Sequence, residues 1–306
     1  MTAYLLRRLA VAVATLWFVA SAVFFVAQVL PGDPVEIQLG EGSLAGEAAA
    51  LRHRLGLDRP LLERYAGFVA GALHGALGSS LRSGRPVGGL LADAWPATAE
   101  LASASLGVGL AIALPLGVLA AARRGRLADT AARWTALLGV SVPGLWLGPM
   151  LILLVAIRLD LLPVGGRHGW ASLVLPALTL GAPLAGLVAR LVRTTLGEEL
   201  GKPYVLAARS RGLARARVVL RHGLRNALLP IVTVIGLQAG SLLAGAVITE
   251  TVFAWPGLGR LLVDAIRARD YPVLQGAVLA IAASYVVINL ITDLVYGWAD
   301  PRARAR

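Results

Sequence analysis

The sequence predicts an all-α, polytopic membrane protein with six transmembrane helices. Hydrophobic residues make up 57% of the 306-residue chain, its mean hydropathy is +0.73, and only 15% of its residues are charged. Ordinary soluble domains carry about 25% charged residues. The apolar residues are also gathered into six runs that approach or exceed the ~20 residues a helix needs to cross a bilayer. These observations make lipid the natural solvent for most of the chain.

The six expected spans cover residues 9–30, 98–122, 131–157, 173–192, 228–252 and 277–295. The first could instead be a signal peptide, since Ala20-Ser21-Ala22 has small residues at suitable spacing. Its apolar run continues to Leu30, however, which is too long for an ordinary signal peptide. The third contains Pro143-Gly144 and Pro149, which predict a bent helix near a transport path, with plain packing as an equal alternative.

Residues 31–97 form the longest stretch without an apolar run. Pro31-Gly32-Asp33-Pro34 ends the first helix, and the mixed sequence that follows predicts an external region of short amphipathic helices. A second short external helix is expected at 258–267, before the sixth span. His53 and His74 have no companions at metal-ligand spacing, and the chain has no cysteine. No metal site or disulfide is therefore predicted.

Arginines orient the expected spans. They cluster at Arg7-Arg8, at 123–126, in the long loop 198–227 and in the tail 299–306, all on one side of the six-span arrangement. Because positive charge collects on the cytoplasmic side of short loops, both termini are expected in the cytoplasm. The net charge of +12 is not read as a nucleic-acid footprint, because it lies beside apolar runs with no recognition motif. Anionic membrane lipid is the expected contact of these basic loops.

The loop between the fourth and fifth spans predicts two short helices joined by a sharp bend. Pro203 suits the first turn of a helix, and Gly212 suits the left-handed position that ends one. A second helix is expected from about Ala214 toward His222, with Arg217, Arg221 and Arg225 on one face. The adjacent acids Glu198-Glu199 are expected to be solvated rather than to form a catalytic pair.

This loop resembles the EAA loop of permease subunits in binding-protein-dependent ABC importers. That pattern has Glu-Ala-Ala, three residues, Gly, and then Ile-x-Leu-Pro, and Ala207, Ala208, Gly212 and Pro230 match it. Leu206 stands where the pattern has Glu, so the contact of that acid cannot be carried over. The stretches LPGDP, LGLDRPL, SLRSGRPV, PATAEL and ETVFAWPGLGR are similar to the dipeptide/oligopeptide branch, whose members also move nickel and glutathione.

The resemblance implies a type I ABC importer permease fold in the bacterial inner membrane. It also implies a second, related permease, two ATPase subunits that bind ATP and Mg²⁺, and a periplasmic or lipid-anchored substrate-binding protein. The permease would expose its path alternately to each side of the membrane. The residues that would contact an ATPase subunit are Leu206, Ala207, Ala208, Arg209, Arg211, Gly212 and Leu213.

The fifth span carries small residues at a spacing of four. Gly236, Gly240 and Ala244 share one helical face, and Ser241 lies beside them. Such a face permits close helix contact. Packing within the chain, contact with the partner permease and lining of the path are the alternatives for this face.

The chain lacks the motifs of an enzyme. Its only lysine, Lys202, is followed by Pro203 rather than Ser or Thr, so no phosphate-binding loop is present and ATP must be handled by another subunit. A stand-alone ion-coupled carrier or channel is the alternative to an importer permease. A proton-coupled carrier would usually show acids in the middle of its spans, whereas Glu100 and Glu250 lie near the expected ends. An integral membrane enzyme would need an ionisable cluster at depth, which the sequence does not show.

Overall fold

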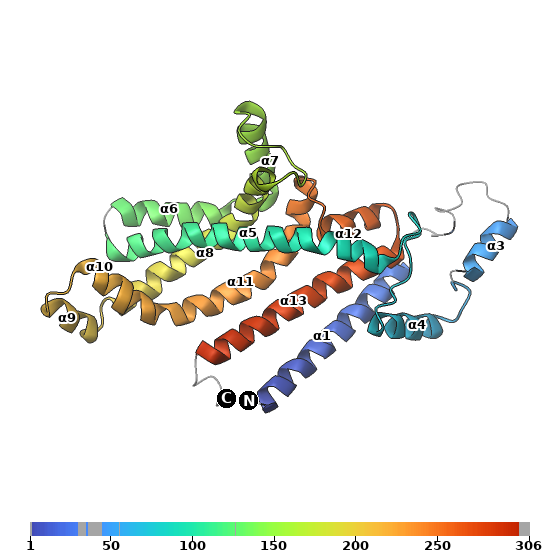
Figure 1. The fold of residues 1–306 in the computed structure, drawn as a ribbon, viewed down its shortest axis with the longest axis horizontal. Coiled ribbons are helices and arrows are strands. Elements are labelled where there is room, and N and C mark those ends of the chain that lie inside the picture. Colours follow the sequence, from blue (N-terminus) through green and yellow to red (C-terminus); the bar gives the residue numbers. More distant parts are fainter. Residues whose placement is uncertain (1, 30–34, 36–44, 55, 126, 300–306) are drawn as a thin grey trace. The chain divides into compact units, whose positions relative to one another are not determined.

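The protein is described by a computed structural model over residues 2–29, 35, 45–54, 56–125 and 127–299. These residues are mainly helical (Figure 1), and the β structure among them is an isolated antiparallel bridge between Ser79 and Pro86. The prediction of an all-α fold is confirmed. The predicted break at 31–34 and the basic tail from residue 300 lie outside the described residues.

Five helices in the described part of the chain are long and apolar enough to cross a membrane. They are α1 (Thr2–Val29), α5 (Val87–Ala122), α8 (Trp170–Glu199), α11 (Arg225–Val252) and α13 (Tyr271–Ala299). Each covers the described part of one of the predicted spans, mostly with extra turns at its polar ends. The expected helices at these five positions are therefore present.

The third predicted span is not one continuous helix. It consists of α6 (Leu127–Ser141), α7 (Gly144–Leu151) and η1 (Ile152–Arg158), a wider π-helical stretch that continues α7. Pro143, in extended conformation, precedes α7. Proline lacks the backbone N–H that a helix needs and keeps the residue before it out of helical conformation. The expected bend at Pro143 is therefore a break, and a continuous span over 131–157 is wrong.

Six shorter elements complete the described fold. They are α3 (Ala45–Arg54), α4 (Leu61–Leu73), α9 (Pro203–Ser210), α10 (Arg215–Arg217), η2 (Val218–Leu224), again π-helical, and α12 (Leu258–Arg267). The predicted short helix at 258–267 is confirmed in position and length by α12. The prediction of short helices in the region 31–97 corresponds to α3 and α4.

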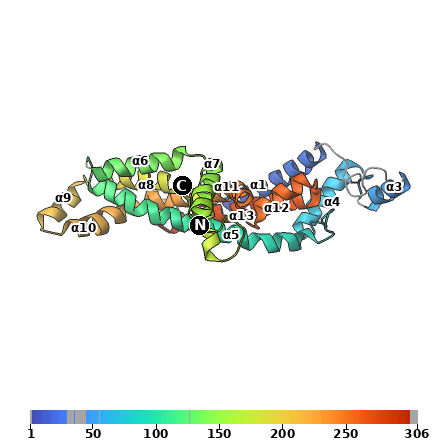
Figure 2. The same ribbon diagram turned by 90° about the horizontal axis from the view of Figure 1, so that it is seen from above.

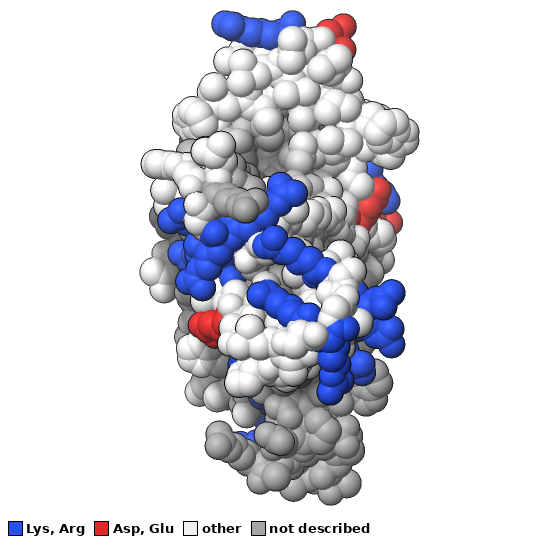
Figure 3. All heavy atoms as spheres, turned by 90° about the vertical axis from the view of Figure 1, so that its left-hand side faces the viewer, with Lys and Arg blue, Asp and Glu red and all other residues white. Residues whose placement is uncertain are grey.

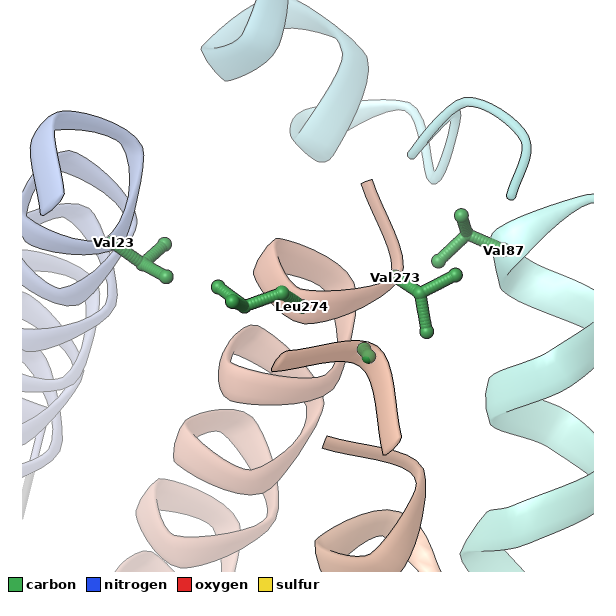
Figure 4. Packing of buried hydrophobic residues seen from close by; sticks show 5 residues of the cluster. Val23, Val87, Val273 and Leu274 are labelled. Atoms are coloured by element: carbon green, nitrogen blue, oxygen red, sulfur yellow. The ribbon is translucent and has the colours of Figure 1, made fainter. Parts of the chain in front are cut away.

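The helices group into two compact units. The first takes in the described parts of Met1–Thr98 and Pro256–Val286, and the second those of Ala99–Trp255 and Val287–Arg306. In the first unit, Val23 of α1 points toward Leu274 of α13, and Val273 points toward Val87 at the start of α5 (Figure 4). These side chains form the apolar core of that unit.

A buried carboxylate fixes the start of α13 within the first unit. Asp270 is only 4% exposed and accepts a hydrogen bond of 2.5 Å from the Ser80 hydroxyl. It also accepts hydrogen bonds from the backbone N–H groups of Leu81 at 3.2 Å and Arg82 at 3.4 Å. A buried charge of this kind is stable only when its oxygens are satisfied in this way. The turn before α5 and the start of α13 are thus held together.

In the second unit α8 is the central helix. Both α6 and α11 pack along it, and the two views of the ribbon show them beside it (Figures 1 and 2). The contact of α8 with α5 depends on glycine. A Cβ atom at Gly109 would lie 2.7 Å from Leu184 Cδ2, and one at Gly181 would lie 2.7 Å from the Ser105 carbonyl oxygen. Small residues let apolar helices approach closely enough for dispersion to stabilise the pair.

A close helix contact at a glycine also joins α11 to the end of α13. A Cβ atom at Gly236 would lie 2.0 Å from Thr292 Cγ2, so no larger residue fits without movement of that side chain. Gly236 therefore packs within its own chain, which is one of the alternatives left open by the sequence. Gly240 is buried, while Ser241 and Ala244 are exposed.

We expect Gly236→Ala to destabilise the protein by about 1 kcal/mol, because overpacking a close helix contact forces side chains to shift. The measurement is the thermal unfolding midpoint of the purified protein in detergent. Gly107→Ala is the matched control, because no atom lies within 4 Å of a Cβ at that helical glycine. It should be neutral or slightly stabilising, since alanine is the better helix former. An unchanged midpoint for Gly236→Ala would contradict the packing.

Candidate functional site

The most unusual local structure lies in the loop between α8 and α11, residues 198–227, which we call the elbow. Pro203 is the first residue of α9, and the helix ends at Ser210. Gly212 has φ +76° and its N–H donates to the Arg209 carbonyl at 2.9 Å, closing the helix end. This left-handed conformation strains any residue with a Cβ. The predicted helix start and the predicted glycine bend are both confirmed.

The elbow has a small apolar core of its own. Val205 and Val218 are fully buried and Ala208 is 8% exposed, with Leu200 and Leu213 packed against them. The bend at Gly212 brings the two sides of this core together, because it turns the chain back between α9 and α10. The angle of the elbow is therefore set by side-chain packing as well as by the backbone.

The opposite face of α9 is open. Leu206 is 54% exposed, and Ala207, Arg209 and Arg211 are exposed as well. This face carries one apolar side chain, one small residue and two guanidinium groups. Ala208, which the sequence places beside Ala207 in a contact surface, belongs instead to the inner core. Leu213 is half-buried at the edge of that core.

The second helix of the elbow does not stop near His222. Backbone torsions stay helical at Val218 and Arg225, so α10 and η2 run directly into α11. Gly223 is buried, and a Cβ atom added there would lie only 2.9 Å from side-chain atoms of Leu196 and Leu200. It is a contact point with α8 rather than a helix end. The expected separate second helix is thus a continuous extension of α11.

The three arginines expected on one face of the second helix are all exposed. Arg217 ends α10, Arg221 lies in η2 and Arg225 begins α11. That they share one helical face stays a prediction.

A cluster of polar side chains holds α9 to the helices on either side. The Tyr204 hydroxyl donates to Glu199 Oε2 at 2.7 Å and accepts from Asn226 Nδ2 at 2.9 Å. Lys202 Nζ donates to Glu199 Oε1 at 2.5 Å. We call these four residues the clamp. It joins the end of α8, the start of α9 and the start of α11, so Glu199 is bound rather than solvated as expected from the sequence.

The pKa values of the clamp follow from these contacts. Burial raises the pKa of Tyr204 above its ordinary value; the hydrogen bond to Glu199 raises it as well, and the one from Asn226 opposes the shift. The hydrogen bond to Glu199 raises the pKa of Lys202. The hydroxyl is therefore neutral and the ammonium is charged at any physiological pH, and the clamp does not change with pH in that range.

One further contact attaches the elbow to α5, and another attaches α6 to α8. Arg215 donates through Nη2 to the Ala122 carbonyl at the end of α5, where a positive charge also suits the helix dipole. Nearby, Arg193 of α8 donates to buried Asp129 at 2.5 Å, and the Gly125 N–H donates at 3.0 Å. The Arg193 hydrogen bond, more than any other contact, holds the pKa of the Asp129 carboxyl well below its usual range. The elbow is thus attached to α5, α8 and α11 together.

The surface around the elbow is strongly basic. Figure 3 faces the end of the molecule where α9 and α10 lie, and Lys and Arg outnumber Asp and Glu on it. The exposed cations of the elbow are Lys202, Arg209, Arg211, Arg215, Arg217, Arg221 and Arg225. Such a surface favours acidic partners and anionic lipid. No group of three or more metal-ligating side chains occurs among the residues described.

We expect Tyr204→Phe to loosen α9 without unfolding the chain. The change removes the hydroxyl and its bonds to Glu199 and Asn226 but keeps the ring. A lost hydrogen bond of about 1 kcal/mol would raise amide hydrogen exchange in α9 roughly fivefold. Tyr285→Phe is the control, because Tyr285 lies on α13 outside the elbow. Equal exchange in α9 for wild type and Tyr204→Phe would show that the clamp does not hold the helix.

Comparison with known proteins identifies the family to which the chain belongs. Residues 113–305 match the family model described as binding-protein-dependent transport system inner membrane component, and residues 1–102 match its N-terminal companion. The dipeptide transport system permease protein DppB of Escherichia coli (strain K12) is 41% identical, with 99% of each chain covered. The glutathione transport system permease protein GsiC of the same strain is 38% identical, with 98% of each covered.

A third relative and a solved structure agree. The di/tripeptide transport system permease protein DppB of Pseudomonas aeruginosa (strain UCBPP-PA14) is 39% identical over 99% of each chain. The inward-facing MetNI methionine ABC transporter is similar in fold, with a TM-score of 0.54 and 20% identity over 69% of this chain and 96% of that one. The chain therefore belongs to the family of binding-protein-dependent transport system inner membrane components, as a multi-pass permease subunit of an ABC importer and not an enzyme.

Proposed function

We propose that this chain forms part of the path for small peptides in an ATP-driven importer, and that the elbow connects it to an ATPase subunit. The geometry that carries the proposal is the open face of α9 on a helix-to-helix bend whose second side is continuous with α11. A partner that moves α9 also moves a helix long and apolar enough to cross the membrane.

The proposed contact uses residues of both sides of the elbow. Leu206, Ala207, Arg209 and Arg211 present the open face, while Ala208, Gly212 and Leu213 set its orientation. Leu206 takes the position at which the usual pattern has Glu, so the contact there is apolar. The basic side chains around it attract an acidic rim on the ATPase subunit and raise the rate of association.

The complete importer contains a second, related permease, two ATPase subunits that bind ATP and Mg²⁺, and a periplasmic or lipid-anchored binding protein. ATP binding closes the ATPase subunits and moves α9 with the groove that holds it. Because α11 continues the elbow, the helices of the second unit reorient and open the path outward, and hydrolysis resets them. The elbow, and with it both termini, faces the cytoplasm, and the region 31–97 faces outward.

Small peptides are the proposed substrate class. The relatives named above are permeases of dipeptide, di/tripeptide and glutathione systems, and the solutes in these names are short peptides or a peptide-like thiol. Ser241 and Ala244 are the exposed members of the small-residue face on α11, and we propose that they line the path or meet the partner permease. Side chains this small exclude little and select little, so the binding protein sets the specificity.

The proposed contact is testable by cross-linking, because the chain has no cysteine of its own. An Ala207→Cys variant, coexpressed with the ATPase subunits, should cross-link to one of them through a short bifunctional thiol reagent. Leu161→Cys is the control, because Leu161 is 68% exposed in the segment between η1 and α8, at the opposite end of α8 from the elbow. It should give no such product.

Sidedness follows from the same two variants. A membrane-impermeant thiol reagent added to intact cells should label Leu161→Cys and spare Ala207→Cys. Labelling of Ala207→Cys from outside, or equal cross-linking of both cysteines to an ATPase subunit, would contradict the proposed contact.

A further inference from the structure

The first unit contains a cavity of about 510 Å³ between the end of α1, the helix α4 and the start of α13. Phe24 and Gln28 of α1 line one side, and Tyr271, Pro272 and Gln275 of α13 line another. The third side comes from α4 and the turn before it. The cavity lies entirely within one unit, so it is a feature of that unit alone.

The side chains on that third side are charged. Arg59, Glu63 and Arg64 line the cavity. Arg64 is half-buried, and in the described part of the chain its guanidinium makes no hydrogen bond or ion pair. Burial lowers the pKa of Arg64 below its ordinary value, yet the group stays charged at any physiological pH. A partly desolvated guanidinium without an anion is poised to bind one.

The side of the cavity formed by α1 and α4 is partly aromatic. The rings of Phe24 and Phe68 lie 5.5 Å apart across α1 and α4, and both line the cavity. Ser21 and Tyr65 are hydrogen-bonded at 2.6 Å, and the Tyr65 ring stacks on Phe25. These contacts fix α4 against α1, so the helix that carries Glu63 and Arg64 is positioned before any ligand arrives. Preorganisation of this kind lowers the cost of binding.

The depth of the cavity indicates which ligand fits. The candidate membrane span of α1 runs over Leu6–Val29 and that of α13 over Tyr271–Leu294. Gln28 and Tyr271, which line the cavity, therefore lie at the ends of two spans. The ends of membrane spans lie at the level of the lipid headgroups. A zwitterionic lipid headgroup carries both a negative and a positive charge at this level. It can therefore pair with the guanidinium and the carboxylate groups of the cavity.

We propose that this cavity binds the headgroup of a zwitterionic glycerophospholipid of the phosphatidylethanolamine type. The phosphate pairs with the Arg64 guanidinium, with Arg59 beside it, and the ammonium group pairs with the Glu63 carboxylate. The acyl chains leave along the apolar faces of α1 and α13. A free peptide carries the same two charges but has no acyl chains to occupy those faces. The bound lipid would fix α4 at the membrane surface.

The test is native mass spectrometry of the full importer complex, purified in detergent, stripped of lipid and titrated with phosphatidylethanolamine. Wild type should retain one lipid more tightly than the rest. Arg64→Gln should weaken its retention about tenfold, because a charge-assisted hydrogen-bond pair is lost. Arg64→Lys should retain more than Arg64→Gln, which separates a charge effect from misfolding. Arg82→Gln, an exposed arginine of the same unit outside the cavity, should behave as wild type.

Two further titrations identify the ligand. Glu63→Gln should bind phosphatidylglycerol relatively better than wild type does, because it loses the partner of the ammonium group. Dialanine should not displace the lipid. Displacement that depends on Arg64 would assign the cavity to a peptide and overturn the proposal, as would equal retention by Arg64→Gln and wild type or an equal loss in Arg82→Gln. None of these readouts depends on transport, so failure of the proposed coupling would leave them unaffected.

Discussion

Gly212→Leu is expected to separate ATP hydrolysis from transport. In proteoliposomes that contain the full importer, the variant should hydrolyse ATP while peptide uptake falls to about one tenth or less. Gly212 has φ +76°, a conformation that costs a residue with a Cβ roughly 1–2 kcal/mol. A leucine there would relieve the strain by rotating the backbone, which redirects the chain toward Leu213. The core that sets the elbow angle would then be lost.

Asparagine is the matched control at this position, because it tolerates the left-handed region better than other residues with a Cβ. A Cβ at Gly212 has no atom within 4 Å, so the side chain itself meets no obstacle. Gly212→Asn should therefore keep most of its uptake per ATP hydrolysed. A wild-type ratio of uptake to hydrolysis in Gly212→Leu would contradict the proposed role of the bend.

Leu206→Ala is expected to weaken assembly with the ATPase subunits about tenfold. Leu206 is 54% exposed on the open face of α9, and burial of a leucine against a partner contributes roughly 1.5–3 kcal/mol. The measurement is the ATPase concentration that gives half-maximal coupling of hydrolysis to the reconstituted permease.

Leu220→Ala controls for the loss of an exposed leucine. Leu220 is 55% exposed, almost the same as Leu206, but it lies on η2 rather than on α9. It should leave the half-maximal concentration unchanged. Equal effects of the two substitutions would show that the open face of α9 is not the contact. Leu206→Glu should bind no better than Leu206→Ala, because it places a carboxylate in an apolar contact beside the acidic rim of the ATPase subunit.

The bend of the elbow is predictable from sequence because two residues with restricted or unusual backbone preferences define it. Pro203 suits a helix start and Gly212 suits a left-handed end, and the structure has both features at those positions. Five of the six spans predicted from the apolar runs are present as long helices for a similar reason, since length and composition alone decide whether a helix can cross a bilayer. Backbone preferences and apolar runs depend only on residues that are close together in the sequence, so they can be recognised without knowledge of the fold.

Features that depend on neighbours in space are not readable in this way. The second helix of the elbow is expected to end near His222, but it continues into α11, and Gly223 packs against Leu196 and Leu200 of α8 and its end. Ala207 and Ala208 are chemically identical, and only the packing of Val218 decides which of them faces inward. At Pro143 the sequence shows a proline, while the choice between a bend and a full break depends on the surrounding helices.

The clamp is a similar case. Glu199, Tyr204 and Asn226 are separated by a proline and by a bend, so no helical spacing relates them. One signal was available: a tyrosine beside Pro203 in a basic loop has a hydroxyl that needs a partner when the ring is partly buried. The two acids at 198–199 were the nearest acceptors. Only the fold shows that Glu199 accepts the hydrogen bond from the Tyr204 hydroxyl and that Glu198 is exposed.

The most direct test of the account is solute uptake by proteoliposomes that contain this permease and its partner permease, with and without the ATPase subunits. Peptide should accumulate only when the ATPase subunits, ATP and the binding protein are all present. Accumulation by the permease pair alone, driven by a proton or sodium gradient, would contradict the account and identify an ion-coupled carrier.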